Sequence, residues 1–173
     1  ILVSCMLVNN ETGAIFPVEE AARAIRRSKA PALLHVDAVQ AFGKLPFTVK
    51  KLGADLLTLS GHKLHAPKGV GALYVKKTTR LLPRTLGGGQ ERGLRSGTES
   101  VPLIGALGEA VRLLPPAGEA LEHIQKLNSL LRQELAQLPG VVLHSPEDAL
   151  PYVLNFSAGK VRGETMLHFL AQR

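Results

Sequence analysis

The chain has 173 residues, 45% of them hydrophobic and 20% charged, which is enough for one sizeable core and part of a second domain. Its formal charge is +7, but the basic residues are scattered and aromatic residues make up only 4% of the chain, so the composition argues against a nucleic-acid-binding surface. No apolar run approaches the roughly 18 residues of a membrane span. The single cysteine, Cys5, excludes an internal disulfide and is typical of a cytoplasmic protein. We therefore expect a cytoplasmic protein and, from the charge distribution and hydropathy above, one that binds neither nucleic acid nor membranes.

The first 37 residues follow a strand–helix–strand pattern. Residues 1–8, ILVSCMLV, form a continuous apolar run that is typical of a strand covered on both faces. A helix is expected from Pro17, with one buried face formed by Val18, Ala21, Ala22 and Ile25. Residues 32–37, ALLHVD, supply the next strand. The pattern predicts a βαβ crossover between parallel strands.

The pattern continues less regularly up to residue 114. We expect a short helix at 48–52, strands at 55–60 and 69–77, a glycine-rich loop at 87–97 and a long helix at 99–114. Alternating strands and helices predict an α/β fold with a mostly parallel sheet covered by helices.

Residues 115–119, PPAGE, have the composition of a linker. After it we expect a helix, two strands and a second helix, at 119–138, 141–145, 152–157 and from Gly163. We therefore predict a large domain over residues 1–115 and the incomplete start of a smaller one over residues 116–173. The chain starts inside an apolar strand and stops inside an amphipathic helix, so we expect it to be an internal piece of a longer protein.

Polar side chains follow three of the predicted strands. Asn10 comes after the first strand, Asp37 and Gln40 after the second, and the run from Ser60 through His62 to Lys63 after the third. Ligands of α/β sheets bind at the carboxyl ends of the strands. We therefore expect these groups to converge on one crevice.

Asp37 and Lys63 suggest a particular chemistry. A buried carboxylate needs a cation, and the protonated ring nitrogen of pyridoxal phosphate is one candidate. A lysine at the desolvated floor of a pocket loses pKa and can form a Schiff base with an aldehyde. We expect Gly61 to let the backbone approach such a cofactor. The competing interpretation is a buried ion pair between Asp37 and Lys63.

Other reactive residues have simpler interpretations. We expect His35 to be either a hydrogen-bonded core residue or a residue that supports a ligand-binding side chain, rather than a ligand itself. We expect Cys5 to be a small core residue rather than a nucleophile. His35, His62 and His65 lack the spacing of a zinc site, so we expect no metal.

Four segments together resemble a known family: VNNETG, HVDAVQAFGKLPF, SGHKLHAPKGVGALYV and GGGQERGLRSGTE. Their order and spacing are similar to those of NifS/IscS-type cysteine desulfurases, which are class V, fold-type I pyridoxal-phosphate enzymes. The resemblance covers almost the whole chain and is tightest from Val8 to Thr98. It implies part of the large fold-type I domain followed by part of a small α+β domain.

The resemblance also implies a role for each matching residue. Lys63 is implied to form the Schiff base with the cofactor and to move protons, while Asp37 faces the ring nitrogen. Gln40 is implied to donate a hydrogen bond to the phenolic oxygen, and Asn10 to lie near the ring and the substrate carboxylate. Ser60 and His62 are implied to bind the phosphate. Thr98 is implied to reach the phosphate of a neighbouring subunit, which implies a homodimer.

The implied reaction converts L-cysteine to L-alanine and leaves a persulfide on a loop cysteine. The sulfur then passes to an acceptor protein for iron–sulfur cluster assembly or tRNA thiolation. This chain departs from the family pattern because it lacks that loop cysteine, the histidine that stacks on the cofactor and the arginine that binds the substrate. We therefore expect the chain alone to be inactive. Two alternatives stay open, namely another class V enzyme such as a selenocysteine lyase, or a non-catalytic scaffold that keeps the fold.

Overall fold

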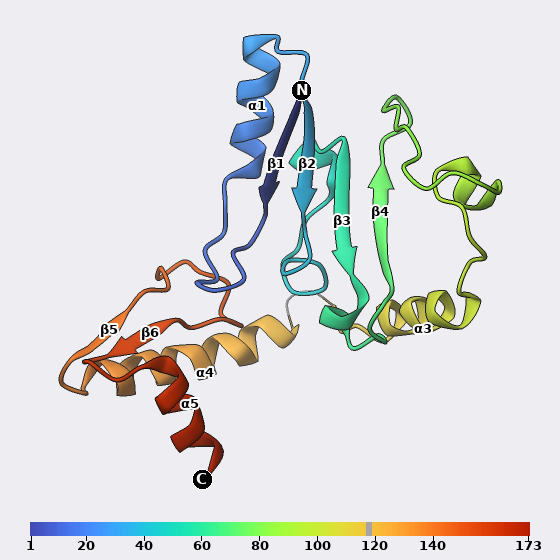
Figure 1. Ribbon diagram of the computed structural model, residues 1–173. Helices are drawn as coiled ribbons and strands as arrows, with labels where there is room; N and C mark the ends of the chain where they lie inside the picture. The colour runs from blue at the N-terminus through green and yellow to red at the C-terminus, as the bar shows by residue number, and fades with distance from the viewer. Residues whose placement is uncertain (117–118) are drawn as a thin grey trace.

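The computed structural model describes residues 1–116 and 119–173, which contain two β-sheets (Figure 1). The first sheet has the order β1-β2-β3-β4, with β1 at Leu2–Met6, β2 at Leu33–Asp37, β3 at Leu56–Ser60 and β4 at Gly71–Val75. Strands β1, β2 and β3 are parallel, and β4 runs antiparallel to β3. The predicted α/β fold with a mostly parallel sheet is therefore confirmed.

Helix α1, Val18–Ser28, makes the predicted crossover between β1 and β2. It begins one residue later than expected, because Pro17 lies at the capping position rather than in the first turn. Val18 and Ala22 are buried, which confirms the predicted inner face. The short helix α2, Val49–Leu52, begins one residue after the predicted start, because Thr48 caps it: the Thr48 hydroxyl accepts the Lys51 N–H at 3.2 Å.

The glycine-rich segment at 87–97 contains a short 3₁₀-type turn, η2, at Gln90–Gly93, in which Glu91 and Arg92 have left-handed φ angles of 47° and 57°, although the sequence predicts only a loop. The segment makes its own polar contacts: the Gly97 N–H donates to Gln90 Oε1 at 3.2 Å, and the Ser96 hydroxyl donates to the Leu86 carbonyl at 2.9 Å. Such local hydrogen bonds stabilise a single turn without an apolar face. The long helix then follows as α3, Val101–Arg112.

The second sheet pairs β5, Val141–Leu143, with β6, Phe156–Ala158, in antiparallel orientation. Along the chain its two strands follow α4, Glu119–Ala136, and precede α5, Gly163–Ala171, which confirms the predicted α-β-β-α order. In Figure 1 the first turns of α4 lie below the carboxyl ends of the parallel strands, and the helix then runs along the second sheet. Residues 117–118 of the predicted linker lie outside the described residues.

One buried cluster holds the first sheet to its covering elements. It contains Leu7, Val8, Val18, Ala22, Leu34, Val36, Ala38, Ala41, Leu52, Ala54, Leu57 and Leu150. Leu150 is only 1% exposed, although it comes from the connection between β5 and β6. Its N–H donates to the Gly13 carbonyl at 2.8 Å. A Cβ at Gly13, where φ is +73°, would lie 3.0 Å from the Leu150 carbonyl oxygen, so only glycine permits this approach.

Arg132 holds the β5–β6 connection against α4. Its guanidinium donates to the Ser145 carbonyl at 3.1 Å and to the Pro146 carbonyl at 2.7 Å, while Nε donates to Asn128 Oδ1 at 2.8 Å. Asn128 in turn donates to the Pro151 carbonyl at 2.9 Å. Two side chains of α4 therefore hold both ends of the segment that carries Leu150.

The outer strands and helices of the chain expose apolar side chains. Leu73 and Tyr74 of β4 are 50% and 42% exposed, and Leu2 of β1 is 57% exposed. Among the residues that the structure describes, no helix is long and apolar enough to cross a membrane.

Asp55, directly before β3, joins the start of that strand to two neighbouring elements. Its Oδ2 accepts the Leu34 N–H at 3.0 Å, and its Oδ1 accepts from the Lys76 ammonium at 2.8 Å. Burial alone would raise the pKa of Asp55, but these hydrogen bonds and the charges of Lys76 and Arg26 outweigh it, so the pKa lies below its ordinary value. The ionised carboxylate is therefore stabilised in the folded protein.

We expect Asp55→Asn in the full-length protein to lower the free energy of unfolding by about 1 kcal/mol at pH 7, because Lys76 is half exposed and water screens part of the pair. Because the pKa of Asp55 is lower in the folded protein than in the unfolded chain, the carboxylate contributes its full stability above the pKa of the unfolded chain, near pH 4. That stability is lost as the pH falls through the pKa of the folded protein. The difference between wild type and variant, measured by urea unfolding, should therefore shrink below about pH 4. The exposed Asp148→Asn serves as the control. Equal stability of Asp55→Asn and wild type at pH 7 contradicts the prediction.

Candidate active site

The turn after β2 begins at Asp37, which is half-buried. Its Oδ1 accepts the Val39 N–H at 2.9 Å and so fixes the direction of the turn. Within the described residues the carboxylate has no ion-pair partner, which leaves its second oxygen available to a cation. Gln40 follows in the same turn and is also half-buried.

Strand β3 ends at Ser60 and leads at once into a short 3₁₀ helix, η1, at Gly61–Leu64. The Ser60 hydroxyl and His62 Nδ1 lie 2.8 Å apart. Leu64 is 3% exposed and holds the turn against the protein, whereas His62 and Lys63 are exposed. The structure therefore places the predicted hydroxyl–imidazole pair directly beside the exposed amine.

Gly61 packs closely against Val70. A Cβ at this position would lie 2.9 Å from Val70 Cγ1 and 3.0 Å from the Val70 carbonyl oxygen. The Gly61 N–H also donates to that carbonyl at 2.8 Å. Close packing of η1 against the residue before β4 therefore requires the glycine.

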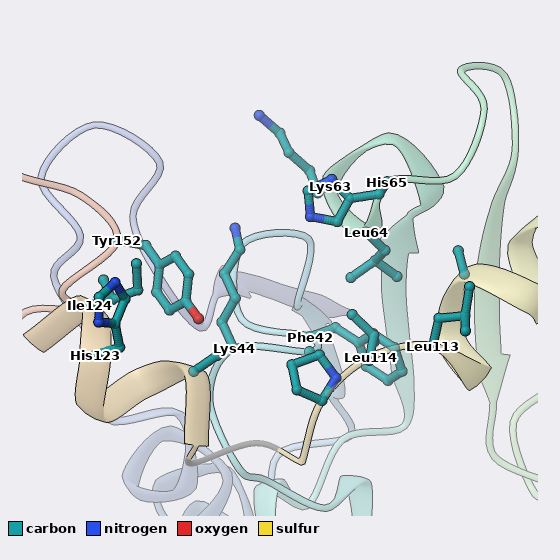
Figure 2. A pocket seen from close by; sticks show the side chains of 14 residues that line it. Phe42, Lys44, Lys63, Leu64, His65, Leu113, Leu114, His123, Ile124 and Tyr152 are labelled. Atoms are coloured by element: carbon teal, nitrogen blue, oxygen red, sulfur yellow. The ribbon is translucent and has the colours of Figure 1, made fainter.

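A cavity of about 420 Å³ opens beside η1 (Figure 2). Its polar lining consists of Lys44, Lys63, His65, His123 and Tyr152, and its apolar lining includes Phe42, Leu64, Leu114 and Ile124. Figure 2 shows the Lys44 side chain rising beside the Tyr152 ring, while Lys63 extends outward from η1. Of the residues predicted from the sequence, Lys63 lines this cavity; Asn10, Asp37, Gln40, Ser60, His62 and Thr98 do not.

The desolvated lysine of the cavity is Lys44 rather than Lys63. Burial, and then the charge of Lys63, lower the pKa of Lys44. Lys63 itself is exposed, so the prediction of a lysine on a desolvated floor is wrong for this residue. Lys63 projects from a one-turn helix whose buried residues are Gly61 and Leu64, and this turn leaves its side chain outside the packed core.

Lys44 is not among the site residues predicted from the sequence. Lys44 Nζ donates to Gln40 Oε1 at 3.5 Å and lies 5.6 Å from the centroid of the Tyr152 ring. Its position four residues after Gln40, about one helical turn away, was the signal in the sequence that could have revealed the first contact. Tyr152 comes from the β5–β6 connection, more than 100 residues later, so no local pattern could reveal the second.

The alternative of an Asp37–Lys63 ion pair is wrong, because no such pair forms within residues 1–116 and 119–173. His35 Nδ1 lies 2.7 Å from the Ser4 hydroxyl and its Nε2 lies 3.3 Å from Thr58 Oγ1, so the predicted hydrogen bonding of His35 is confirmed, although the residue is only half-buried and is not part of the buried cluster.

Cys5 packs against the core, and burial raises the pKa of its thiol, so it is not an activated nucleophile. The described residues contain no group of three or more side chains that could hold a metal ion.

Two further predicted site residues, Asn10 and Thr98, lie in exposed segments outside the helices and strands. Asn10 is exposed in a tight turn after β1, in which Asn9 Oδ1 accepts the N–H groups of Glu11 and Thr12 at 2.9 and 2.8 Å. Thr98 is exposed in the segment between η2 and α3. Within this single chain neither residue reaches the cavity.

The whole chain, residues 1–173, matches the family described as aminotransferase class-V. Similar curated proteins include a mitochondrial cysteine desulfurase of Candida albicans, 43% identical over 96% of this chain and 35% of its own length. They also include the cysteine desulfurase IscS of Ehrlichia chaffeensis, 45% identical over 96% of this chain and 42% of its own length. The chain thus spans less than half the length of these relatives.

Solved structures of related proteins have the same fold. A NifS-like protein that is 43% identical superimposes with a TM-score of 0.93 over 99% of this chain and 47% of its own length. The protein SspA, solved in complex with cysteine, is 33% identical and superimposes with a TM-score of 0.77, again over 99% of this chain and 47% of its own. These structural relatives agree with the fold-type I prediction.

Proposed function

This chain belongs to the aminotransferase class-V family, and from that premise we propose that the whole protein is a pyridoxal-phosphate-dependent cysteine desulfurase. The observation that carries the proposal is the exposed Lys63 amine on η1, directly after β3 and beside a cavity. At the end of the neighbouring strand lies a half-buried carboxylate, Asp37, with an oxygen that is free for a cation. The names of the curated relatives support the choice of reaction.

The donor set at the strand ends fits pyridoxal phosphate. An amine can bind the aldehyde, a carboxylate can hold a proton on the ring nitrogen, and the adjacent Ser60 hydroxyl and His62 imidazole can donate to the phosphate. When bound, the cofactor supplies the electron sink for a carbanion on the substrate. Gln40 would donate to the phenolic oxygen, and Asn10 would face the substrate carboxylate.

Two further residues of this chain bear on the reaction: Lys63 as a carrier of protons, and Cys5 as a thiol that does not take part. Lys63 would carry protons to and from the substrate, which its exposed position on a short turn permits. Cys5 cannot receive the sulfur, because it is packed against the core and its pKa is raised. The proposed persulfide therefore forms on a thiol outside residues 1–173, and these residues alone release no sulfur from cysteine.

The substrate we propose is L-cysteine, and the product beside L-alanine is a persulfide whose sulfur passes to an acceptor protein for iron–sulfur assembly or tRNA thiolation. We propose a cytoplasmic homodimer in which Thr98 reaches the phosphate of the neighbouring subunit; its exposed position before α3 leaves it free to do so. We also propose a division into a large domain, residues 1–115, and a small domain that begins at residue 116. The separate second sheet supports this division.

The test is borohydride reduction of the full-length protein after incubation with pyridoxal phosphate. Peptide mass spectrometry should find the reduced cofactor on Lys63, and the unreduced protein should form alanine from L-cysteine. Formation of alanine from selenocysteine but not from cysteine would favour the lyase alternative. A colourless protein that forms alanine from neither substrate would favour the scaffold.

A further inference from the structure

Lys44 is an amine for which neither the sequence motifs nor the proposed reaction provides a role. It lies in the turn between β2 and α2, is half-buried and lines the same cavity as Lys63. Two groups hold its ammonium, the Gln40 amide oxygen at 3.5 Å and the face of the Tyr152 ring at 5.6 Å. Because an amide oxygen and an aromatic ring replace water on two sides of the ammonium, its position is more defined than that of a lysine on an open surface.

The contact with Gln40 determines more than a position. The two ends of a glutamine amide have nearly the same shape, but one accepts hydrogen bonds and the other donates them. A lysine ammonium has only donors, so the oxygen of Gln40 must face Lys44, and the amide NH₂ group must point away from it. Among the described residues this is the only side-chain hydrogen bond that Gln40 makes.

We propose that Lys44 is a positioning residue that holds the Gln40 amide with its oxygen toward the ammonium and its NH₂ group free to donate a hydrogen bond elsewhere. The inference rests on the proposed function, in which Gln40 donates a hydrogen bond to the phenolic oxygen of the cofactor. Without Lys44 the amide can rotate and present its oxygen to another oxygen, which is repulsive. Tyr152 limits the movement of Lys44 from the other side, and Tyr152 itself packs against the buried cluster that contains Leu150.

The test measures the visible absorption of the full-length holoenzyme as a function of pH. A hydrogen bond donated to the phenolic oxygen favours its deprotonated form, so losing that donor should raise the pH midpoint of the spectral change. We expect Lys44→Met to raise this midpoint by about 0.5–1 pH unit. Lys44→Arg, which keeps a cationic donor, should stay within about 0.2 unit of wild type. Lys50→Met, on the exposed face of α2, is the matched control and should leave the midpoint unchanged.

A double-mutant cycle separates positioning from a simple effect of charge. In a Gln40→Leu background, Lys44→Met should move the midpoint by less than half as much as in wild type, because the amide that it orients is gone. An equal shift in both backgrounds means that Lys44 acts through its charge alone and overturns the proposal. No shift in either background overturns it too. If Lys44→Met does not fold, Lys44→Gln replaces it. A glutamine at position 44 has both a donor and an acceptor end, so it does not force the oxygen of Gln40 to face it, and the midpoint should shift as in Lys44→Met.

The proposed function and this inference fail in different ways. A full-length protein that takes up no cofactor, or carries it on a residue other than Lys63, overturns both. A protein that carries the cofactor on Lys63 but whose midpoint does not respond to Lys44→Met retains the proposed function and overturns the role of Lys44 alone.

Discussion

Replacing Lys63 with alanine in the full-length protein should lower alanine formation from L-cysteine by at least about 10²–10⁴-fold and remove the cofactor's visible absorption band. Alanine provides neither an amine to bind the aldehyde nor a group to carry protons. The nearest other amine on this cavity is Lys44, which is held between Gln40 and Tyr152 and therefore cannot easily take over. Alanine release and the absorption spectrum are the two measurements.

The control for this experiment is Lys77→Ala, which removes an exposed lysine that lies after β4. It should retain both the colour and the activity. Borohydride reduction of Lys63→Ala, followed by peptide mass spectrometry, shows whether any residual cofactor has moved to Lys44. Alanine formation within about tenfold of wild type would be incompatible with a proton-transfer role for Lys63.

Leu150→Ala is expected to have the largest effect on stability. Leu150 is 1% exposed and packs into the cluster of the first sheet, so its truncation should lower the free energy of unfolding by about 2–5 kcal/mol. That is a large share of the roughly 5–15 kcal/mol that stabilises an ordinary domain. Chemical unfolding of the full-length protein, followed by circular dichroism, measures the effect.

A volume-conserving substitution provides the comparison. Leu150→Met fills nearly the same space and should cost less than about 1.5 kcal/mol. If alanine and methionine at position 150 destabilise the protein equally, then burial in the core is not what this side chain contributes. Loss of Leu150 should also make the β5–β6 connection more sensitive to proteases, because its contact with the first sheet is then weakened.

Local patterns in the chain predicted most of the secondary structure. The apolar run at 1–8, the periodic apolar face of α1 and the glycine-rich stretch at 87–97 each indicated an element or a break near the place where the structure has it. Alternation of strands and helices was enough to predict parallel pairing of β1 and β2. The exceptions, such as the short helix η2, depend on side-chain hydrogen bonds that residue type alone does not reveal.

The candidate site was predictable only in part, for a similar reason. The placement of Asp37, Ser60, His62 and Lys63 at strand ends follows from sequence order, because parallel strands bring their carboxyl ends to one edge. The exposure of Lys63 could not be predicted, because it depends on how the single turn of η1 packs through Leu64. Lys44 was missed because its environment includes the ring of Tyr152, which is distant in sequence.

The amino-acid sequence by itself therefore determined the class of fold, the order of its elements and the kinds of reactive group at the strand ends, since these depend on neighbouring residues and on periodicity. Only the tertiary structure decided that Leu150 completes the core of the first sheet and that Lys44, rather than Lys63, is the desolvated amine. Burial and electrostatic environment depend on contacts between segments far apart in the chain, and chain folding alone brings those segments together.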